Sequence, residues 1–346
     1  MKNLKSIFLI VLFIVIVLIN VTYMEKAFAS DIQDKKILEL QKRLLSENKA
    51  EIIADIRQIT SKIVNLEQKT GITGPSGFKV YSLEESKEFV RLYESLQLRL
   101  HYLNYGNLQI SLNQWEGYSL NTENSQPYSQ QKVIRLMKEL EENGVPKKFI
   151  SNFKIFLLPY VIPDVSGLGG AGYTILSSQP VNGGLIDNQL QVTLYHEIGH
   201  HVHLSYMLKE STAGAELWKE FHRIRGGAWH GPGAVNTKAW DDSSEETFAE
   251  DFRMLFGTNQ PFFGDISLGD PRNSPNKAKD EKSFIIQLAQ NKVKVKYESP
   301  WIPQQRLLLW QLEGELITGL WVFLGIGILL VKRPKYLGYL NKNLTA

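Results

Sequence analysis

Two segments in the first third of the chain place apolar residues at the spacing of an α-helix. Between residues 31 and 70, apolar side chains recur at helical intervals, which collects them on one face. The glycine-rich sequence at 71–77 ends this pattern, and a second helix is expected from about Leu83 to Leu103. Residues 30–125 are therefore predicted to form a helical N-terminal region.

The pattern becomes mixed after residue 125. Segments with helical periodicity alternate with short stretches rich in β-forming residues. Helices are expected at about 131–143, 189–208 and 244–256, and strands at 153–159 and 172–178. A few strands set among helices are typical of an α+β domain with a small mixed sheet, which we assign to residues 126–300.

The glycine-rich sequence SGLGGAG at 166–172 lies between the two expected strands. It has neither the strand and helix context of a dinucleotide-binding GxGxxG motif nor the lysine of a P-loop. We predict a flexible loop here and no nucleotide site.

The N-terminus has the features of a secretory signal peptide. Lys2 and Lys5 precede an apolar run from Ile7 to Ile19, which is short for a spanning helix. The small residues Ala27 and Ala29 form the pattern that signal peptidase cleaves. Residues 1–29 are predicted to be a signal peptide, and an uncleaved anchor is the alternative.

A second apolar stretch lies near the C-terminus. Residues 316–331 are apolar and are followed at once by a basic cluster. We predict a transmembrane helix at 313–331 and a cytoplasmic tail at 332–346, which places the body of the protein outside the cell. A buried core helix is the alternative.

Composition narrows the chemistry of the body. The chain contains no cysteine, so any metal ion must be bound by His, Asp or Glu. This composition fits a surface protein of a Gram-positive bacterium. The net charge of +3 comes from the two ends, and the body between them is slightly acidic. Nucleic-acid binding is therefore not expected.

The sequence LYHEIGHHVHL at 194–204 contains the motif H-E-x-x-H, formed by His196, Glu197 and His200. Residues four apart lie on one face of an α-helix, so both imidazoles can reach one ion. Glu197 lies where a general base can contact water bound to that ion. The motif predicts a zinc site, and the alternative is a structural helix with solvated histidines.

The same helix has an apolar stripe that predicts burial in the core. The stripe consists of Leu190, Leu194, Ile198 and Val202. Gly199 lies in the interior of this helix, where glycine costs about 1 kcal/mol relative to alanine. A packing reason or a close approach at this glycine is therefore implied.

Two histidines leave a catalytic zinc site one protein ligand short. The H-E-x-x-H-x-x-G-x-x-H pattern is excluded, because His203 and Tyr206 occupy its glycine and third histidine positions. A glutamate from the segment 243–257 is the remaining common solution. Glu246 is the preferred ligand, and Glu245 is a competitor.

Glu250 follows Glu246 by one helical turn. A carboxylate there can accept the N–H of a ligand imidazole and fix its tautomer, and Glu250 is also an alternative ligand. Ser243 and Glu246 equally fit a helix-capping box, which would explain the acidic residues without a metal.

HEIGHH, followed by EETFAEDF, resembles the gluzincin metallopeptidase domain of anthrax lethal factor and of clostridial Pro-Pro endopeptidases, over about residues 130–265. The resemblance implies one Zn²⁺ ion on His196, His200 and Glu246, with Glu197 as the catalytic base. It also implies that an extended peptide substrate pairs with the strand at 172–178.

The sequence departs from this family at one functional position. The family has a tyrosine shortly before the ligand glutamate that is thought to bind the oxyanion, whereas this chain has Ala239 and Trp240 in that region. His230 and Tyr173 are candidates for an oxyanion stabiliser.

We therefore expect an α+β, zincin-like domain with a small mixed sheet, an H-E-x-x-H helix and a second glutamate helix. The expected function is a membrane-anchored, extracellular zinc endopeptidase acting on extended peptides or proteins. The alternative is a catalytically inactive zincin-fold module that binds partners at the cell surface. An intramembrane protease is not expected, because Gln191 and His203 make the helix too polar for lipid.

Overall fold

The computed structural model describes most residues between 39 and 302, with gaps in several connecting segments. The predicted signal peptide, transmembrane helix and cytoplasmic tail lie outside the described residues. No helix of the part that is described is long and apolar enough to cross a bilayer. The described residues are 39–40, 42–44, 49–105, 114–115, 118–119, 125–162, 165–180, 188–207, 212–227, 243–257, 268–291, 293, 295 and 297–302.

The chain divides into two compact units. The first contains residues 1–57, 97–109 and 303–346, and the second contains residues 58–96 and 110–302. The second unit therefore reaches into the predicted N-terminal helical region and does not begin at residue 126. Two strands explain this difference, because they lie before residue 126 and belong to the central sheet.

Helices α2 (Lys49–Lys69) and α3 (Leu83–Tyr105) confirm the helices expected from the apolar spacing. The beginning of α2 and the end of α3 belong to the first unit. Within that unit, Asp55 accepts hydrogen bonds from Arg99 at 2.9 and 3.0 Å. The remainder of each helix belongs to the second unit.

The second unit is built on a five-stranded sheet with the order β1-β2-β6-β8-β7. Strands β2, β6 and β8 run parallel, whereas β1 and β7 pair antiparallel with their neighbours. The sheet is therefore mixed, as predicted. Its strands are β1 (Ile72–Thr73), β2 (Lys79–Tyr81), β6 (Lys154–Leu157), β7 (Gly167–Gly170) and β8 (Tyr173–Leu176).

Two further strand pairs are short. They are β3 (Gln114–Trp115) with β4 (Tyr118–Ser119), and β5 (Ser125–Gln126) with β9 (Gln179–Pro180).

The glycine-rich segment expected as a loop is a strand. Residues Gly167–Gly170 form β7, which pairs with β8 at the end of the sheet. The prediction was wrong because glycine, although it weakens a strand, also occurs in strands where another element approaches the backbone closely. Here another element lies too close for side chains, as described below for the metal centre.

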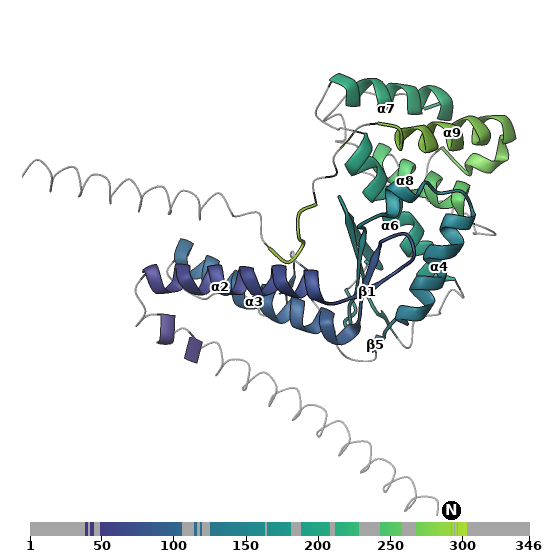
Figure 1. Cartoon of the computed structure of the whole chain (residues 1–346). Helices are drawn as coiled ribbons and strands as arrows, with labels where there is room; N and C mark the ends of the chain where they lie inside the picture. The colour runs from purple at the N-terminus through teal and green to yellow at the C-terminus, as the bar shows by residue number, and fades with distance from the viewer. Residues whose placement is uncertain are drawn as a thin grey trace, which may run out of the picture. The chain divides into compact units, whose positions relative to one another are not determined.

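Helices surround this sheet in the second unit (Figure 1). Helix α6 packs against β7 and β8, α8 packs against α6, and α9 contacts both α7 and α8. Their bounds are α4 (Gln130–Glu142), α5 (Lys147–Ile150), α6 (Gln189–Tyr206), α7 (Thr212–Arg225), α8 (Ser244–Phe256), the 3₁₀ helix η2 (Pro271–Asn273) and α9 (Pro275–Leu288).

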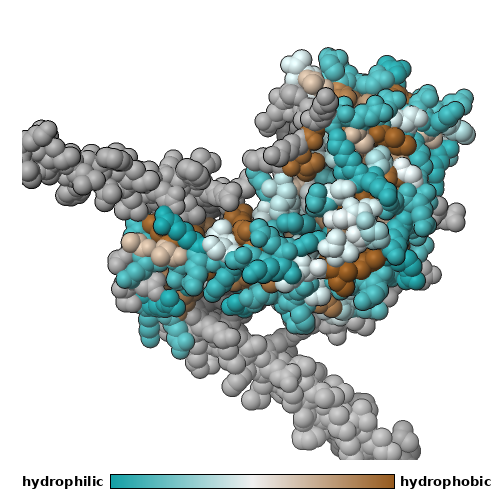
Figure 2. Space-filling view, in the orientation of Figure 1, coloured by the Kyte–Doolittle hydropathy of each residue, from teal (hydrophilic) through white to brown (hydrophobic). Residues whose placement is uncertain are grey.

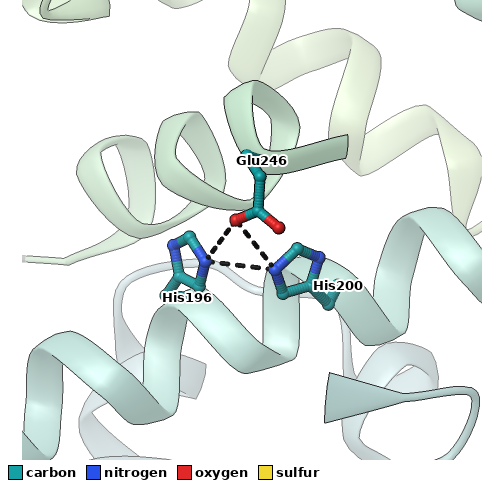
Figure 3. Close-up of side chains that lie close together, drawn as sticks. All are labelled: His196, His200 and Glu246. Carbon is teal, nitrogen blue, oxygen red and sulfur yellow. Dashed lines mark hydrogen bonds and ion pairs between the residues drawn. The ribbon is translucent and has the colours of Figure 1, made fainter. Parts of the chain in front are cut away.

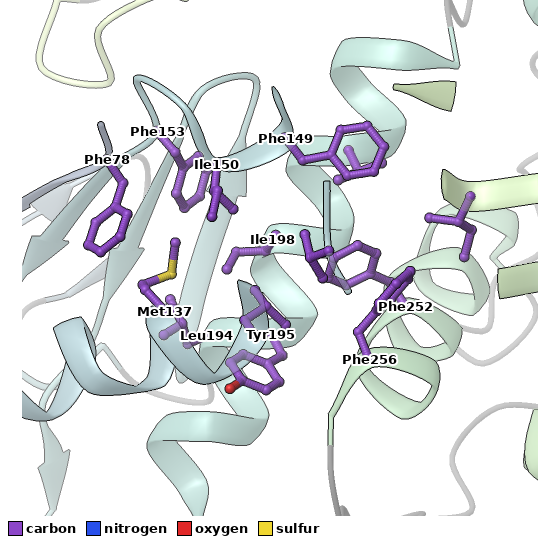
Figure 4. Packing of buried hydrophobic residues seen from close by; sticks show 14 of the residues in the cluster. Phe78, Met137, Phe149, Ile150, Phe153, Leu194, Tyr195, Ile198, Phe252 and Phe256 are labelled. Atoms are coloured by element: carbon purple, nitrogen blue, oxygen red, sulfur yellow. The ribbon is translucent and has the colours of Figure 1, made fainter. Parts of the chain in front are cut away.

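The main core lies between the sheet and helices α4, α6 and α8 (Figure 4). The apolar stripe predicted for α6 supplies Leu194 and Ile198, which are fully buried. Ile155 and Leu157 of β6 belong to the same cluster. Phe156 lies between them in sequence and therefore points to the opposite face of the sheet.

That opposite face has an aromatic cluster of its own. Phe156 stacks on Tyr81 with ring centroids 4.5 Å apart, and Trp301 packs on Phe89 at 5.4 Å. Trp301 is fully buried, so the segment 297–302 is an integral part of the second unit. The described surface in Figure 2 is mainly hydrophilic, with apolar residues in separate small areas.

Candidate metal centre

The two histidines of the H-E-x-x-H motif project from one face of α6 toward a glutamate of α8 (Figure 3). The Nε2 atoms of His196 and His200 are 3.1 Å apart. Glu246 Oε2 lies 3.1 Å from Nε2 of His196 and 3.3 Å from Nε2 of His200. These three residues form a group that can hold a metal ion.

Local sequence explains where helix α8, which carries Glu246, begins. Ser243 is the N-cap of α8, and its hydroxyl accepts a hydrogen bond from the backbone N–H of Glu246 at 3.4 Å. The same hydroxyl donates to Glu245 at 3.1 Å. The backbone of Glu246 therefore takes part in the helix cap while its side chain lies near the two histidines. The side chain of Glu245 contacts the capping serine instead.

Gly199 explains how the two helices come close enough. A Cβ atom built on Gly199 would lie 2.6 Å from the Cα atom and 2.8 Å from the carbonyl oxygen of Ala249 in α8. Any side chain at this position would therefore separate α6 from α8. The close approach inferred from the sequence is present, and it brings Glu246 over the two histidines.

Glu250 lies behind the metal group. Its Oε2 atom is 3.4 Å from Nδ1 of His196, which is the ring nitrogen that points away from Glu246. Arg253 holds the same carboxylate with two hydrogen bonds, one of them from Nε at 2.8 Å. The structure therefore places Glu250 between the ring of His196 and a buried guanidinium.

Glu197 lies beside the group but outside it. Glu197 is 7% exposed, and its carboxylate faces β7. A Cβ atom on Gly169 would lie 2.6 Å from Oε2 of Glu197, and one on Gly167 would lie 3.1 Å from Oε1. No residue that the structure describes donates a hydrogen bond to this carboxylate. The glycines of β7 therefore leave room for a buried and unpaired acid.

The charges of the group influence one another strongly. Burial lowers the pKa of His196, but hydrogen bonds with Glu246 and Glu250 outweigh burial and raise it to about 9. Burial raises the pKa of Glu246, yet both imidazoles bring it well below its ordinary value. The pKa of Glu250 is lowered to about 2, because Arg253 and His196 overcome the effect of burial.

Glu197 responds in the opposite direction. Burial is the largest cause and raises the pKa of its carboxyl, and the carboxylate of Glu246 adds to this effect. The imidazoles of His196 and His200 oppose it. The two glutamates nearest the histidines therefore differ: Glu246 stays ionised, while Glu197 takes up a proton more readily than an ordinary glutamate.

Tyr173 is not brought to the metal group. Side chains alternate between the faces of a sheet, and Gly167 and Gly169 face α6. Tyr173 is paired with Gly170 and therefore lies on the other face. There its ring packs edge-on against Tyr297, with the ring centroids 6.3 Å apart. Its proposed role in oxyanion binding does not fit this position.

The other oxyanion candidate, His230, lies outside the described residues, as do Ala239 and Trp240.

The substrate strand implied by the family resemblance also needs correction. Strand β8 occupies residues 173–176 and is paired on both sides, with β6 and with β7. It has no open edge for a peptide, whereas β7 is the strand at the end of the sheet.

Sequence reasoning missed three features around the group. Arg253 supports Glu250, the glycines of β7 make room for Glu197, and His203 contacts His200 with its Nε2 atom 3.0 Å from Nδ1. The spacing of His203 and His200, three residues apart on one helix, is the sequence signal that could have indicated their contact.

Comparison with known proteins adds no family assignment. Neither the protein-family models nor the curated proteins compared with this sequence match it.

Proposed function

We propose that this chain is a zinc-dependent endopeptidase in which Glu197 is the general base. The observation that carries the proposal is the Glu197 carboxylate. It is buried next to a His/His/Glu group and accepts no hydrogen bond from the described residues. A metal site with a purely structural role has no use for such a carboxylate.

The three donor atoms lie close enough together to bind one metal ion, and the ligand types are the reason for proposing zinc. Ligands of tetrahedral zinc at about 2.0–2.2 Å from the ion lie roughly 3.3–3.6 Å from one another. The donor atoms of His196, His200 and Glu246 are separated by 3.1, 3.1 and 3.3 Å, so one distance is at the lower end of this range and two are slightly shorter. Two imidazoles and one carboxylate are also a ligand set of catalytic zinc, which leaves one position for water or substrate.

The chemistry follows from the side chains around that position. Zinc, when bound, supplies polarisation of the scissile carbonyl and a lower pKa for the attacking water. Glu197 takes the proton from this water and delivers it to the nitrogen of the leaving amine. His196 is held by Glu250 through Nδ1, which keeps its Nε2 atom directed at the metal position.

The outer edge of β7 pairs with no strand among the described residues, which supports an extended peptide as the substrate. Ser177 N–H donates to the carbonyl of Ser166 at 3.0 Å, so alternate residues from Ser166 onward bond toward β8 in the observed register. The backbone groups of Gly167 and Gly169 then point outward. A peptide that adds to this edge would bond to the same two glycines that lie against Glu197.

The cellular location is part of the same proposal. The signal peptide at 1–29 and the transmembrane helix at 313–331 would present the metal centre outside the cell, anchored to the membrane. Accessibility of an extracellular tag to protease on intact cells, compared with lysed cells, tests this arrangement.

A peptide library incubated with the full chain tests the activity. We expect cleavage that a chelator abolishes and Zn²⁺ restores, with one zinc ion bound per chain. Zinc binding without any cleavage would favour the inactive binding module. A chain that binds no zinc would overturn the proposal.

A further inference from the structure

The two ligand histidines use the same nitrogen for the metal group but have different partners behind them. Both present Nε2 to Glu246. Nδ1 of His196 faces the carboxylate of Glu250, whereas Nδ1 of His200 faces Nε2 of His203 at 3.0 Å. The second contact replaces the usual carboxylate or carbonyl acceptor with another imidazole.

This contact determines how protons are arranged on both rings. When Nε2 of His200 binds a metal ion, its lone pair is used and the ring proton must be on Nδ1. Nδ1–H then donates, so Nε2 of His203 must accept. His203 therefore carries its own proton on Nδ1, and the tautomers of the two rings depend on each other.

The ring of His203 is fixed by the surrounding core. The residue is 4% exposed, and its ring lies 5.9 Å from the rings of both Trp218 in α7 and Phe248 in α8. The rings of His203 and His200 are 5.2 Å apart and steeply inclined, which suits a hydrogen bond between them rather than stacking. Helices α7 and α8 thus hold the acceptor in place.

We propose that His203 is a positioning residue, which holds His200 in the tautomer and orientation that present Nε2 to the metal ion. This inference rests on the proposed metal-binding function and adds a residue to the support of that site.

His201 shows what a purely structural histidine looks like on the same helix. Its Nδ1 accepts the N–H of Gly172 at 2.8 Å, and its Nε2 donates to the carbonyl of Phe149 at 2.8 Å. It is buried and connects α6 to the backbone of distant segments, but these contacts do not reach the metal group. His201 is therefore the matched control for His203.

The test measures zinc affinity of the full chain by competition with a chromophoric chelator. His203→Leu removes the acceptor and is expected to weaken zinc binding about 10–100-fold. His203→Gln places a carbonyl oxygen near the position of Nε2 and should recover most of the affinity, whereas the shorter His203→Asn should not. His201→Gln should lower the melting temperature but leave zinc affinity as in the wild type.

The visible absorption of the Co²⁺-substituted protein is the second readout. We expect His203→Leu and His203→Asn to change the spectrum and His201→Gln to leave it unchanged. If the wild type binds no zinc, the proposed function fails. If it binds zinc and His203→Leu binds equally well, the role of His203 is overturned while the proposed function stands. Should His203→Leu not fold, equal affinity of the Gln and Asn variants would overturn it.

Discussion

Glu67 and Glu197 are both helical glutamates of the same compact unit, and both are buried, with exposures of 5% and 7%. Both oxygens of the Glu67 carboxylate have partners. Tyr297 donates to it at 2.8 Å, Ser299 donates to the same oxygen, and Lys154 forms an ion pair with it at 2.7 Å. The carboxylate of Glu197 accepts no hydrogen bond from the described residues.

The difference distinguishes Glu67, a structural acid, from Glu197, the proposed general base. Burying a carboxylate is costly unless charged and hydrogen-bonding groups compensate. At Glu67, Lys154 and two hydroxyls provide that compensation, so the charge ties the segment 297–302 to α2 and the sheet. At Glu197 no hydrogen bond from the described residues offsets the cost, and only the nearby imidazoles of His196 and His200 oppose it. Such an incompletely compensated acid is typical of a functional site.

Substitution of Glu197 should have the largest effect. Glu197→Gln keeps the size of the side chain but removes the base, and we expect kcat to fall about 10²–10⁴-fold. Zinc content and melting temperature should stay close to those of the wild type. Library cleavage and metal analysis are the measurements, and wild-type cleavage by this variant would contradict the mechanism.

Glu67→Gln is the matched substitution at the structural glutamate. It leaves Lys154 without its charged partner and should destabilise the fold by about 3 kcal/mol. The kcat of the folded fraction should change little. Urea unfolding monitored by circular dichroism measures the first effect, and a variant with normal stability but lost activity would remove the distinction between the two glutamates.

The metal group should also respond to pH in a way that can be measured without metal. The pKa of His196 is raised from 6.5 to about 9, so protonated His196 stabilises the folded, metal-free chain. This contribution is fully present below pH 6.5 and is lost as the pH rises through about 9, with a total of about 3 kcal/mol. Denaturant unfolding at several pH values tests this loss.

Zinc provides the control for the pH experiment, because it replaces the proton on His196. Saturating Zn²⁺ should suppress the loss of stability between pH 6.5 and 9. His196→Gln should make the profile of the metal-free chain less steep. A smaller loss should remain, because burial and Asp251 raise the pKa of Glu281 to about 10 and its contribution falls over the same interval. A profile that rises over this interval would show that other groups dominate.

Gly169→Ala should have the smallest effect of the series. The added methyl group would lie 2.6 Å from Oε2 and 2.9 Å from the backbone oxygen of Glu197, so the base must move. We expect kcat to fall about tenfold through its misplacement, with KM and zinc content less affected. Unchanged kcat would mean that β7 does not position Glu197.

Much of the metal centre can be predicted from local sequence. The spacing of His196 and His200 places both rings on one helical face, and the apolar stripe of α6 predicts its burial. Ser243 predicts where α8 begins. These predictions succeed because helical periodicity and N-terminal capping act over a few residues.

Other features depend on segments that are far apart in the chain. Glu245, Glu246 and Glu250 are all plausible ligands in the sequence, and only the approach of α6 to α8 distinguishes them. The same applies to the residues of β2, whose pairing with β6 extends the second unit into the region expected to be helical. Local periodicity carries no information about such pairings.

The sequence by itself determined the chemical types at the centre: two imidazoles, a neighbouring acid and a second acid from a later helix. Tertiary structure decided which acid meets the imidazoles, that the glycines form an edge strand against Glu197, and that Tyr173 faces away. The physical reason is distance. Helical phase follows from the covalent chain, whereas the close contacts at Gly199 and Gly169 exist only after remote backbones have packed together.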